Sequence, residues 1–301
     1  MKMNNKLKPQ LKNHDVIKKV LRKVEVSLLL SDKRKVETLL VYLPIENGES
    51  KHSVFFDLIK DELLHNFALT CKEIDRKLKR PSKIAIDQLF KKALSKLSQQ
   101  TAHGELGELI LFTILDVYLQ APRLLSKISL KTSARMPVYG ADSIHAQFIK
   151  GGLRLYLGES KLYTSFSSAA TAAVESIKSA SDKYIQEFNL IDSHLDLPEL
   201  DEDSQEELIR ILNPFENTSK LDFIHSPCFI GFADGNLIKD ATSDDDFIQR
   251  YIHVAFEHID DYYKKIELQG LDINSTTLFI LPFSDIKKLV DSFIAHLEIE
   301  K

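Results

Sequence analysis

The sequence has no tryptophan, only two cysteines, and no long apolar run among its 301 residues. A helix that spans a bilayer needs about 20 consecutive apolar residues, and the N-terminal stretch MKMNNKLKPQLKNHD lacks the apolar core of a signal peptide. Cys71 and Cys228 lie far apart and lack the spacing of zinc ligands, which favours buried, reduced thiols. We therefore expect a cytoplasmic protein with no membrane segment and no zinc site.

The charge of the chain is small overall but unevenly placed. The formal net charge of -4 argues against a protein that coats nucleic acid with its whole surface. Residues 1–36 carry 11 Lys/Arg against 3 Asp/Glu, residues 121–184 carry 9 against 4, and residues 187–207 hold nine acids and no Lys or Arg. Solvated faces are the ordinary explanation. The alternative is an acidic loop for regulation or partner binding, near a nucleic-acid surface formed by Lys127, Lys131, Arg135, Lys150 and Arg154.

The spacing of apolar residues predicts two regions, with a boundary near residue 95. In the first, 1–95, strands are expected at 24–30 and 37–45 and helices at 52–78 and 85–100. We assign partner or DNA contacts to this N-terminal α/β region. In the second, 96–301, we expect helix 104–121, strands 123–131, 141–149 and 153–161, helix 166–188, strand 226–233, helix 247–268, strand 276–283 and helix 285–297. This order predicts an α/β (α+β) fold, in which helices cover a mixed sheet.

Strands 141–149 and 153–161 form a predicted hairpin that ends in charged residues. A turn at Lys150-Gly151 places Asp142 opposite Glu159, whereas a turn at Gly151-Gly152 places it opposite Lys161. Both registers gather the three side chains at one open end. Because side chains alternate along a strand, all three share a face with the apolar residues of the hairpin. Charges at such a rim are costly to desolvate unless they bind a metal or one another.

This combination of residues suits metal-assisted hydrolysis of a phosphodiester. Asp142, Glu159 and the backbone carbonyl of Ser160 offer hard oxygen ligands for Mg²⁺ or Mn²⁺. Lys161 would hold the attacking water or the developing charge. A further carboxylate could come from the preceding helix, where Glu105 and Glu108 are three residues apart and therefore share one side.

The order of motifs resembles the PD-(D/E)XK nuclease fold over about residues 103–233. In that family a helix glutamate precedes an acid, a Glu-x-Lys at a strand end, a helix and a further strand; here these fall on GELGE, GADSIH, LGESK, SSAATAAVESI and PCFIGFA. The resemblance implies a restriction-endonuclease-like mixed sheet with an N-terminal α/β extension. It also implies a Mg-dependent deoxyribonuclease whose catalytic residues are Glu108, Asp142, Glu159 and Lys161. The family's spacing from Gly104 selects Glu108, and Glu105 stays possible.

The motifs GELGE, YGADSIH, LGESK and LFILPF together resemble the HamA proteins of the Hachiman anti-phage system over nearly the whole chain. HamA proteins are nuclease effectors paired with a helicase, HamB. The resemblance implies a HamB-like helicase and DNA as partners, with the nuclease held in check until helicase action on DNA and ATP releases it. The alternative is a non-cleaving regulatory or DNA-sensing subunit of a helicase complex.

Simpler explanations exist for several of these residues. Glu159 and Lys161 taken alone could be a strand-end ion pair worth about 0–1 kcal/mol. His145 faces away from the predicted site, which favours a packed or hydrogen-bonded histidine over a ligand. Tyr163 and Ser165 could touch a phosphate, although a helix cap is the better explanation at this position.

Overall fold

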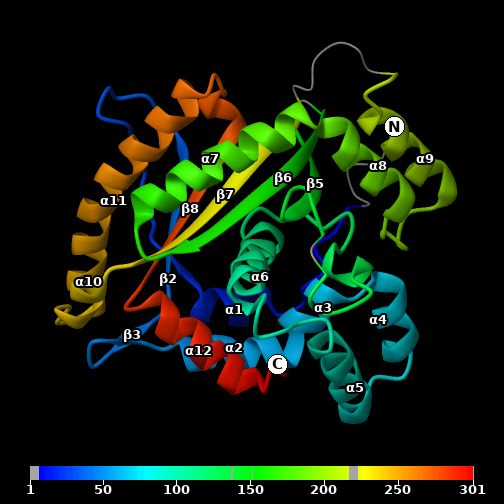
Figure 1. Ribbon diagram of the computed structural model, residues 1–301, viewed down its shortest axis with the longest axis horizontal. Helices are drawn as coiled ribbons and strands as arrows, with labels where there is room; N and C mark the ends of the chain where they lie inside the picture. The colour runs from blue at the N-terminus through cyan, green and yellow to red at the C-terminus, as the bar shows by residue number, and fades with distance from the viewer. Residues whose placement is uncertain (1–6, 137, 151, 217–222, 301) are drawn as a thin grey trace.

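A six-stranded mixed sheet forms the centre of the protein (Figure 1). The computed structural model describes residues 7–136, 138–150, 152–216 and 223–300. Four strands are parallel to one another, and a short antiparallel strand or hairpin partner lies at each edge. In spatial order the strands are β1 (Arg22–Lys23), β2 (Glu37–Tyr42), β8 (Thr276–Phe283), β7 (Ile224–Ala233), β6 (Gly152–Tyr163) and β5 (Ser143–Ile149). The predicted mixed sheet flanked by helices is therefore confirmed.

Helices cover both faces of the sheet, which explains why the burial of its central strands is nearly continuous rather than alternating. All eight residues of β8 are buried, as expected for a strand with helices on both sides. Helices α7 (Phe166–Asp182) and α11 (Asp244–Leu268) pack on one face, whereas α6 (Ala102–Val117) and α12 (Ile286–Leu297) pack on the other (Figure 1). Among the described residues, no helix is both long and apolar enough to cross a membrane.

The N-terminal region shares the main hydrophobic core with the rest of the chain. Strand β2 pairs in parallel with β8, and the rings of Phe56 and Phe293 lie 5.7 Å apart between centroids. The region contains α1 (His14–Val20), the short strands β3 (Ile45–Glu46) and β4 (Glu49–Ser50), α2 (His52–Leu58), a π-helical turn (Ile59–Leu63), α3 (Leu64–Ala68), α4 (Cys71–Leu78) and α5 (Lys83–Leu94). A single hydrophobic core thus contains residues from both sides of position 95.

Two glycines allow α6 to pack closely on β6, and this contact places the helix beside the predicted site. A Cβ added at Gly107 would lie 3.3 Å from Ser160 Oγ, and one added at Gly158 would lie 2.9 Å from Leu111 Cδ2. The glycine in LGESK therefore serves helix packing, because a larger side chain there would have to push aside the Leu111 side chain of α6.

Two predicted strands are wrong. Residues 24–30 form no regular strand, although Leu29 makes an isolated bridge with Lys35. Buried and exposed side chains alternate along this segment, as the sequence pattern predicted, but the segment pairs with no strand of the described chain. Residues 123–131 contain only a 3-10 turn (Ile128–Leu130) and an isolated bridge from Arg123 to His145. This segment turns its basic side chains inward to acids and carbonyls, which replaces strand pairing.

Two long predicted helices are each broken. Within 52–78 the helix stops at Leu69 and restarts behind the N-cap Thr70, whose capping box with Glu73 is a recognisable sequence signal. Within 166–188 it breaks at Lys183, because α7 packs in the main core whereas the next helix packs in a second, smaller core against β5 and β6. The remaining helices are α8 (Tyr184–His194), α9 (Glu202–Leu212), α10 (Gly235–Lys239) and a 3-10 turn (Ile273–Ser275).

The acidic stretch 187–207 is mostly helical rather than a loop, since α8 and α9 contain most of it. Two of its acids are internal. Glu187 is 2% exposed, and the 5% exposed Asp196 accepts a hydrogen bond of 2.6 Å from the backbone N–H of Cys71. These two acids are therefore parts of the fold and are not free for a partner.

Candidate active site

The hairpin register brings Asp142 and Glu159 together. Ile149 pairs with Gly152 and Ser143 pairs with Gly158, so the Lys150-Gly151 alternative holds, although Gly151 itself lies outside the described residues. Continuing this register places Asp142 opposite Glu159. Asp142 Oδ2 accepts hydrogen bonds from Ser160 N at 2.8 Å and Ser160 Oγ at 2.9 Å. Ser160 was expected to offer only its carbonyl, but its hydroxyl also fixes Asp142.

Glu159 and Lys161 form an ion pair next to Asp142. Lys161 Nζ donates to Glu159 Oε1, and Glu159 is only 6% exposed. Burial, followed by the negative charge of Asp142, raises the pKa of Glu159 to about 7. Burial also raises the pKa of Asp142, against the opposing effects of Lys161 and Ser160. Burial alone would lower the pKa of Lys161, but the two carboxylates outweigh it and raise that pKa.

The two helix glutamates have different surroundings. Glu105 is buried, pairs with Lys131 and accepts a 2.8 Å hydrogen bond from Thr101 Oγ1. Glu108 is partly exposed and makes no hydrogen bond or ion pair within the described part of the chain. Its pKa is raised well above the ordinary value, first by burial and then by the charges of Asp142 and Glu105. Glu108 thus extends the carboxylate group of Asp142 and Glu159, whereas Glu105 is committed to Lys131.

A buried ion pair that the sequence did not reveal holds the loop before Asp142. Lys127 Nζ lies 3.5 Å from Glu187 Oε2 and donates to the carbonyl of Tyr139 at 3.0 Å. Glu187 Oε1 accepts the backbone N–H of Ala141 at 2.8 Å. Gly140 has a φ of +104°, and a Cβ there would lie 2.3 Å from Glu187 Oε1 and 2.5 Å from Lys127 Nζ. The one available signal was a glutamate on the apolar face of α8.

The predicted nucleic-acid contacts do not form one surface. Lys127 and Lys131 are each 7% exposed and paired with Glu187 and Glu105, so their assignment to a surface is corrected. Arg135 is exposed on the loop before Asp142. Lys150 is exposed at the hairpin turn, about 27 Å along β5 from Asp142 at ~3.4 Å per residue. Arg154 lies near Glu37, with 3.8 Å between Nη1 and Oε2, about 17 Å along β6 from Glu159.

Two of three neighbouring residues have the structural roles that the simpler explanations gave them. His145 is fully buried and its Nδ1 donates to the carbonyl of Ala121 at 2.6 Å. Burial lowers the pKa of His145 to about 3, so the ring is neutral. Ser165 is the N-cap of α7 and accepts from Ser168 N at 3.4 Å. Tyr163 ends β6, is exposed and is not the cap of α7, so the helix-cap explanation is wrong for this residue.

The donor set at the hairpin end fits a loosely held divalent cation. Within the described residues, no group of three or more His, Cys, Asp or Glu side chains is arranged to hold a metal ion. Two carboxylates and the Ser160 carbonyl remain, which is the number of protein ligands that Mg²⁺ takes when it keeps several waters. Burial is the main cause of the raised pKa values of Asp142 and Glu159, because it disfavours their charged forms. A cation between them would offset that effect.

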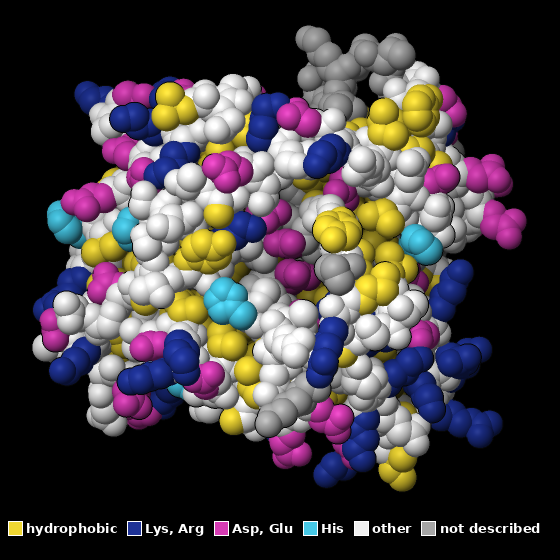
Figure 2. Space-filling view, in the orientation of Figure 1, with side chains coloured by type: hydrophobic (Ala, Val, Ile, Leu, Met, Phe, Trp, Pro, Cys, Tyr) yellow, Lys and Arg dark blue, Asp and Glu magenta, His cyan; other side chains and the backbone are white. Residues whose placement is uncertain are grey.

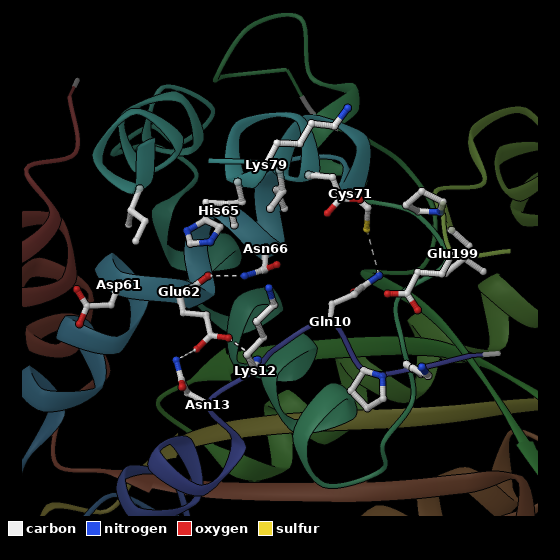
Figure 3. Close-up of a pocket in the computed structure, with 18 of the residues that line it drawn as sticks. Gln10, Lys12, Asn13, Asp61, Glu62, His65, Asn66, Cys71, Lys79 and Glu199 are labelled. Carbon is white, nitrogen blue, oxygen red and sulfur yellow. Dashed lines mark hydrogen bonds between the residues drawn. The ribbon is translucent and has the colours of Figure 1, made fainter. Parts of the chain in front are cut away.

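Acidic side chains gather near the centre of the face in Figure 2, in the region where α6, β5 and β6 meet in Figure 1. A well-formed cavity lies elsewhere in the fold. It has a volume of about 570 Å³, contains none of the hairpin residues, and lies between the segment 8–13, helices α3 to α5 and the segment 197–200 (Figure 3). Gln10 and Leu11 at its edge donate backbone hydrogen bonds to Asp116 of α6.

The helix-covered mixed sheet, with carboxylates at the end of β6, is consistent with an α+β protein of nuclease-like fold. The family model HamA matches residues 15–297, which is most of the chain. The protein therefore belongs to the HamA family, a component of Hachiman anti-phage defence. No curated protein matches the chain.

Proposed function

We propose that the protein is a metal-dependent deoxyribonuclease, the effector of its defence system, with Mg²⁺ or Mn²⁺ as cofactor. The observation that carries this proposal is the meeting of Asp142, Glu159 and Lys161 at one strand end. Two adjacent carboxylates, Glu159 buried and Asp142 half-buried, cost stability, and such pairs are typical of functional sites. A strand-end ion pair would need only one of them.

Each residue has a role that follows from its contacts. A divalent cation held by Asp142, Glu159 and the Ser160 carbonyl would polarise the phosphate and lower the pKa of a bound water. Ser160 already binds Asp142 Oδ2 through its N–H and hydroxyl, which leaves Oδ1 for the cation. Glu159 orients Lys161, whose remaining N–H donors can bind the attacking water or a phosphate oxygen. Glu108 can accept a hydrogen bond from a second water.

The test is Mg²⁺-dependent cleavage of DNA by Glu159→Gln and Lys161→Met variants. Each should lose at least ~100-fold in rate, which is the usual cost of removing one preorganised charge contact in an active site. Both variants should still be folded at the assay temperature, which their midpoints of thermal unfolding check. The matched control is Lys178→Met, because Lys178 is an exposed lysine paired with Asp182 on α7. Cleavage at the parent rate by both site variants would show that the site is wrong.

We further propose that a HamB-like helicase holds the chain so that DNA cannot reach the site, and that ATP-driven movement on DNA releases it. The support for this proposal is that the candidate active site needs no catalytic group from a partner. Inhibition of cleavage in the resting state would therefore have to come from the partner. The isolated protein and the ATP-free complex should be compared at equal Mg²⁺ concentration. Cleavage by the resting complex alone would refute restraint by the partner, and cleavage by neither, with or without ATP, would favour a non-cleaving subunit.

A further inference from the structure

One exposed tyrosine precedes the first strand of the hairpin, and a second exposed tyrosine ends its second strand. Tyr139 precedes Asp142 by three residues and is 83% exposed, and Tyr163 follows Lys161 by two residues and is 38% exposed. Neither phenol makes a hydrogen bond with any other described residue. Tyr139 lies in the loop before β5, and Tyr163 is the last residue of β6.

The two tyrosines belong to segments anchored on different elements of the fold. The backbone of Tyr139 is fixed on the α8 side, since its carbonyl accepts from Lys127 and the next residue contacts Glu187. Tyr163 lies on the α12 side. In Figure 2, hydrophobic side chains are exposed on both sides of the central acidic group.

Tyr163 also lines a depression that extends away from the site. This depression has a volume of about 330 Å³, and its other lining residues include His103, Thr164 and Lys287. Small-ligand pockets occupy roughly 300–1,000 Å³, so the space suits one planar group with a polar attachment. A nucleobase on its sugar has that chemistry.

Few cations near the site are free to bind phosphates. Lys127 and Lys131 are consumed by internal acids, and Lys150 lies at the other end of the hairpin. A duplex-binding protein that relies on the backbone makes about 6–10 phosphate contacts. The face around the carboxylates cannot supply that number, whereas stacking of bases on aromatic rings needs no cation.

We propose that Tyr139 and Tyr163 stack unpaired nucleobases on either side of the scissile phosphate, so that the site takes a single strand and not a duplex. This inference rests on the proposed nuclease function. It makes stacking the main source of local affinity. The affinity should therefore fall only weakly with salt, with a slope near that of one or two phosphate contacts.

The experiment measures binding of a fluorescent 12-nucleotide strand by the full-length protein, with Ca²⁺ in place of Mg²⁺ and a gel to show that the strand stays intact. Tyr139→Ala and Tyr163→Ala should each weaken binding roughly 5- to 150-fold, which is the range for loss of one stacked base. The Phe variants at both positions should keep parental affinity, because stacking needs the ring and not the hydroxyl. Phe256→Ala, at an aromatic residue 43% exposed on α11, is the matched control.

Duplex DNA and an RNA strand of the same sequence form further arms. A single strand of either sugar bound more tightly than duplex supports the inference, and the arm that binds identifies the sugar. Ala variants that keep single-strand affinity within twofold would overturn it, as would equal losses for duplex or equal losses in the Phe variants. If cleavage depends on Glu159 but on neither tyrosine, the stacking proposal is refuted and the nuclease proposal stands. If binding depends on the tyrosines but no cleavage occurs with Mg²⁺ or Mn²⁺, the nuclease proposal is refuted and stacking stands.

Discussion

Replacing Gly140 with alanine should destabilise the protein and displace Asp142. The backbone at Gly140 has φ +104°, where a residue with a Cβ is strained by about 1–3 kcal/mol. The new Cβ would also lie 2.3 Å from Glu187 Oε1, so the carboxylate must move and release the N–H of Ala141. A hydrogen bond to a charged group contributes about 1.5–3 kcal/mol. We therefore expect a total loss of about 2.5–6 kcal/mol in the free energy of unfolding.

Gly270→Ala is the matched control for this substitution. Gly270 also has a positive φ, of +71°, but nothing lies within 4 Å of the position its Cβ would take. This variant should lose only the backbone cost, about 1–2 kcal/mol. Urea unfolding of both variants against the parent protein measures the difference. Equal losses would refute the role of the Lys127–Glu187 pair in holding this loop.

The same pair of variants separates stability from activity. Below the unfolding transition, Gly140→Ala should still cleave about 100-fold more slowly, because a displacement of about 1 Å in a catalytic group can cost that much. Gly270→Ala should cleave at the parent rate. If Gly140→Ala keeps full activity while folded, the position of Asp142 does not depend on this anchor.

Two further predictions concern charge. His145 has a pKa of about 3 in the folded protein against about 6.5 when unfolded, so the unfolded state gains the proton first and stability falls as the pH drops from about 6.5 towards 3. His145→Gln should reduce that pH dependence by about 1.4 kcal/mol per pH unit, measured by urea unfolding. An unchanged pH dependence would contradict the burial argument. Arg135→Glu should reduce the salt slope of single-strand binding by about 0.7, whereas Lys150→Glu should not change it; an effect of Lys150 alone would put the strand at the wrong end of the hairpin.

The hairpin and its charged end could be predicted because strand geometry imposes a period of two that sequence patterns record directly. Asp142 precedes the apolar residues of its strand at that period, whereas Glu159 and Lys161 follow those of theirs, and both possible turns gave the same meeting point. The sequence left the register open because glycine is tolerated at each turn position. Only the pairing of Ile149 with Gly152 decides it.

Basic residues were the least predictable part of the site. A lysine in a sequence carries no sign of whether its ammonium faces water or an internal acid 26 or 60 residues away. Lys131 meets Glu105 and Lys127 meets Glu187 only because the segment 123–131 folds as a turn against α6 and α8. The prediction of a strand at 123–131 and the prediction of a basic surface thus failed for one reason.

The inward lysines also bear on how the site would meet its substrate. Lys127 acts on Asp142 and Glu108 as well as on Glu187, and it favours the charged forms of these carboxylates. An ammonium that is paired with internal carboxylates stabilises the site but is not free to bind phosphate. The chain also has a net charge of -4. A protein built like this gains little from long-range attraction to a polyanion. Under the proposed function, affinity must then come from short-range contacts such as stacking and from a partner that already holds the nucleic acid, which is what a helicase partner would provide.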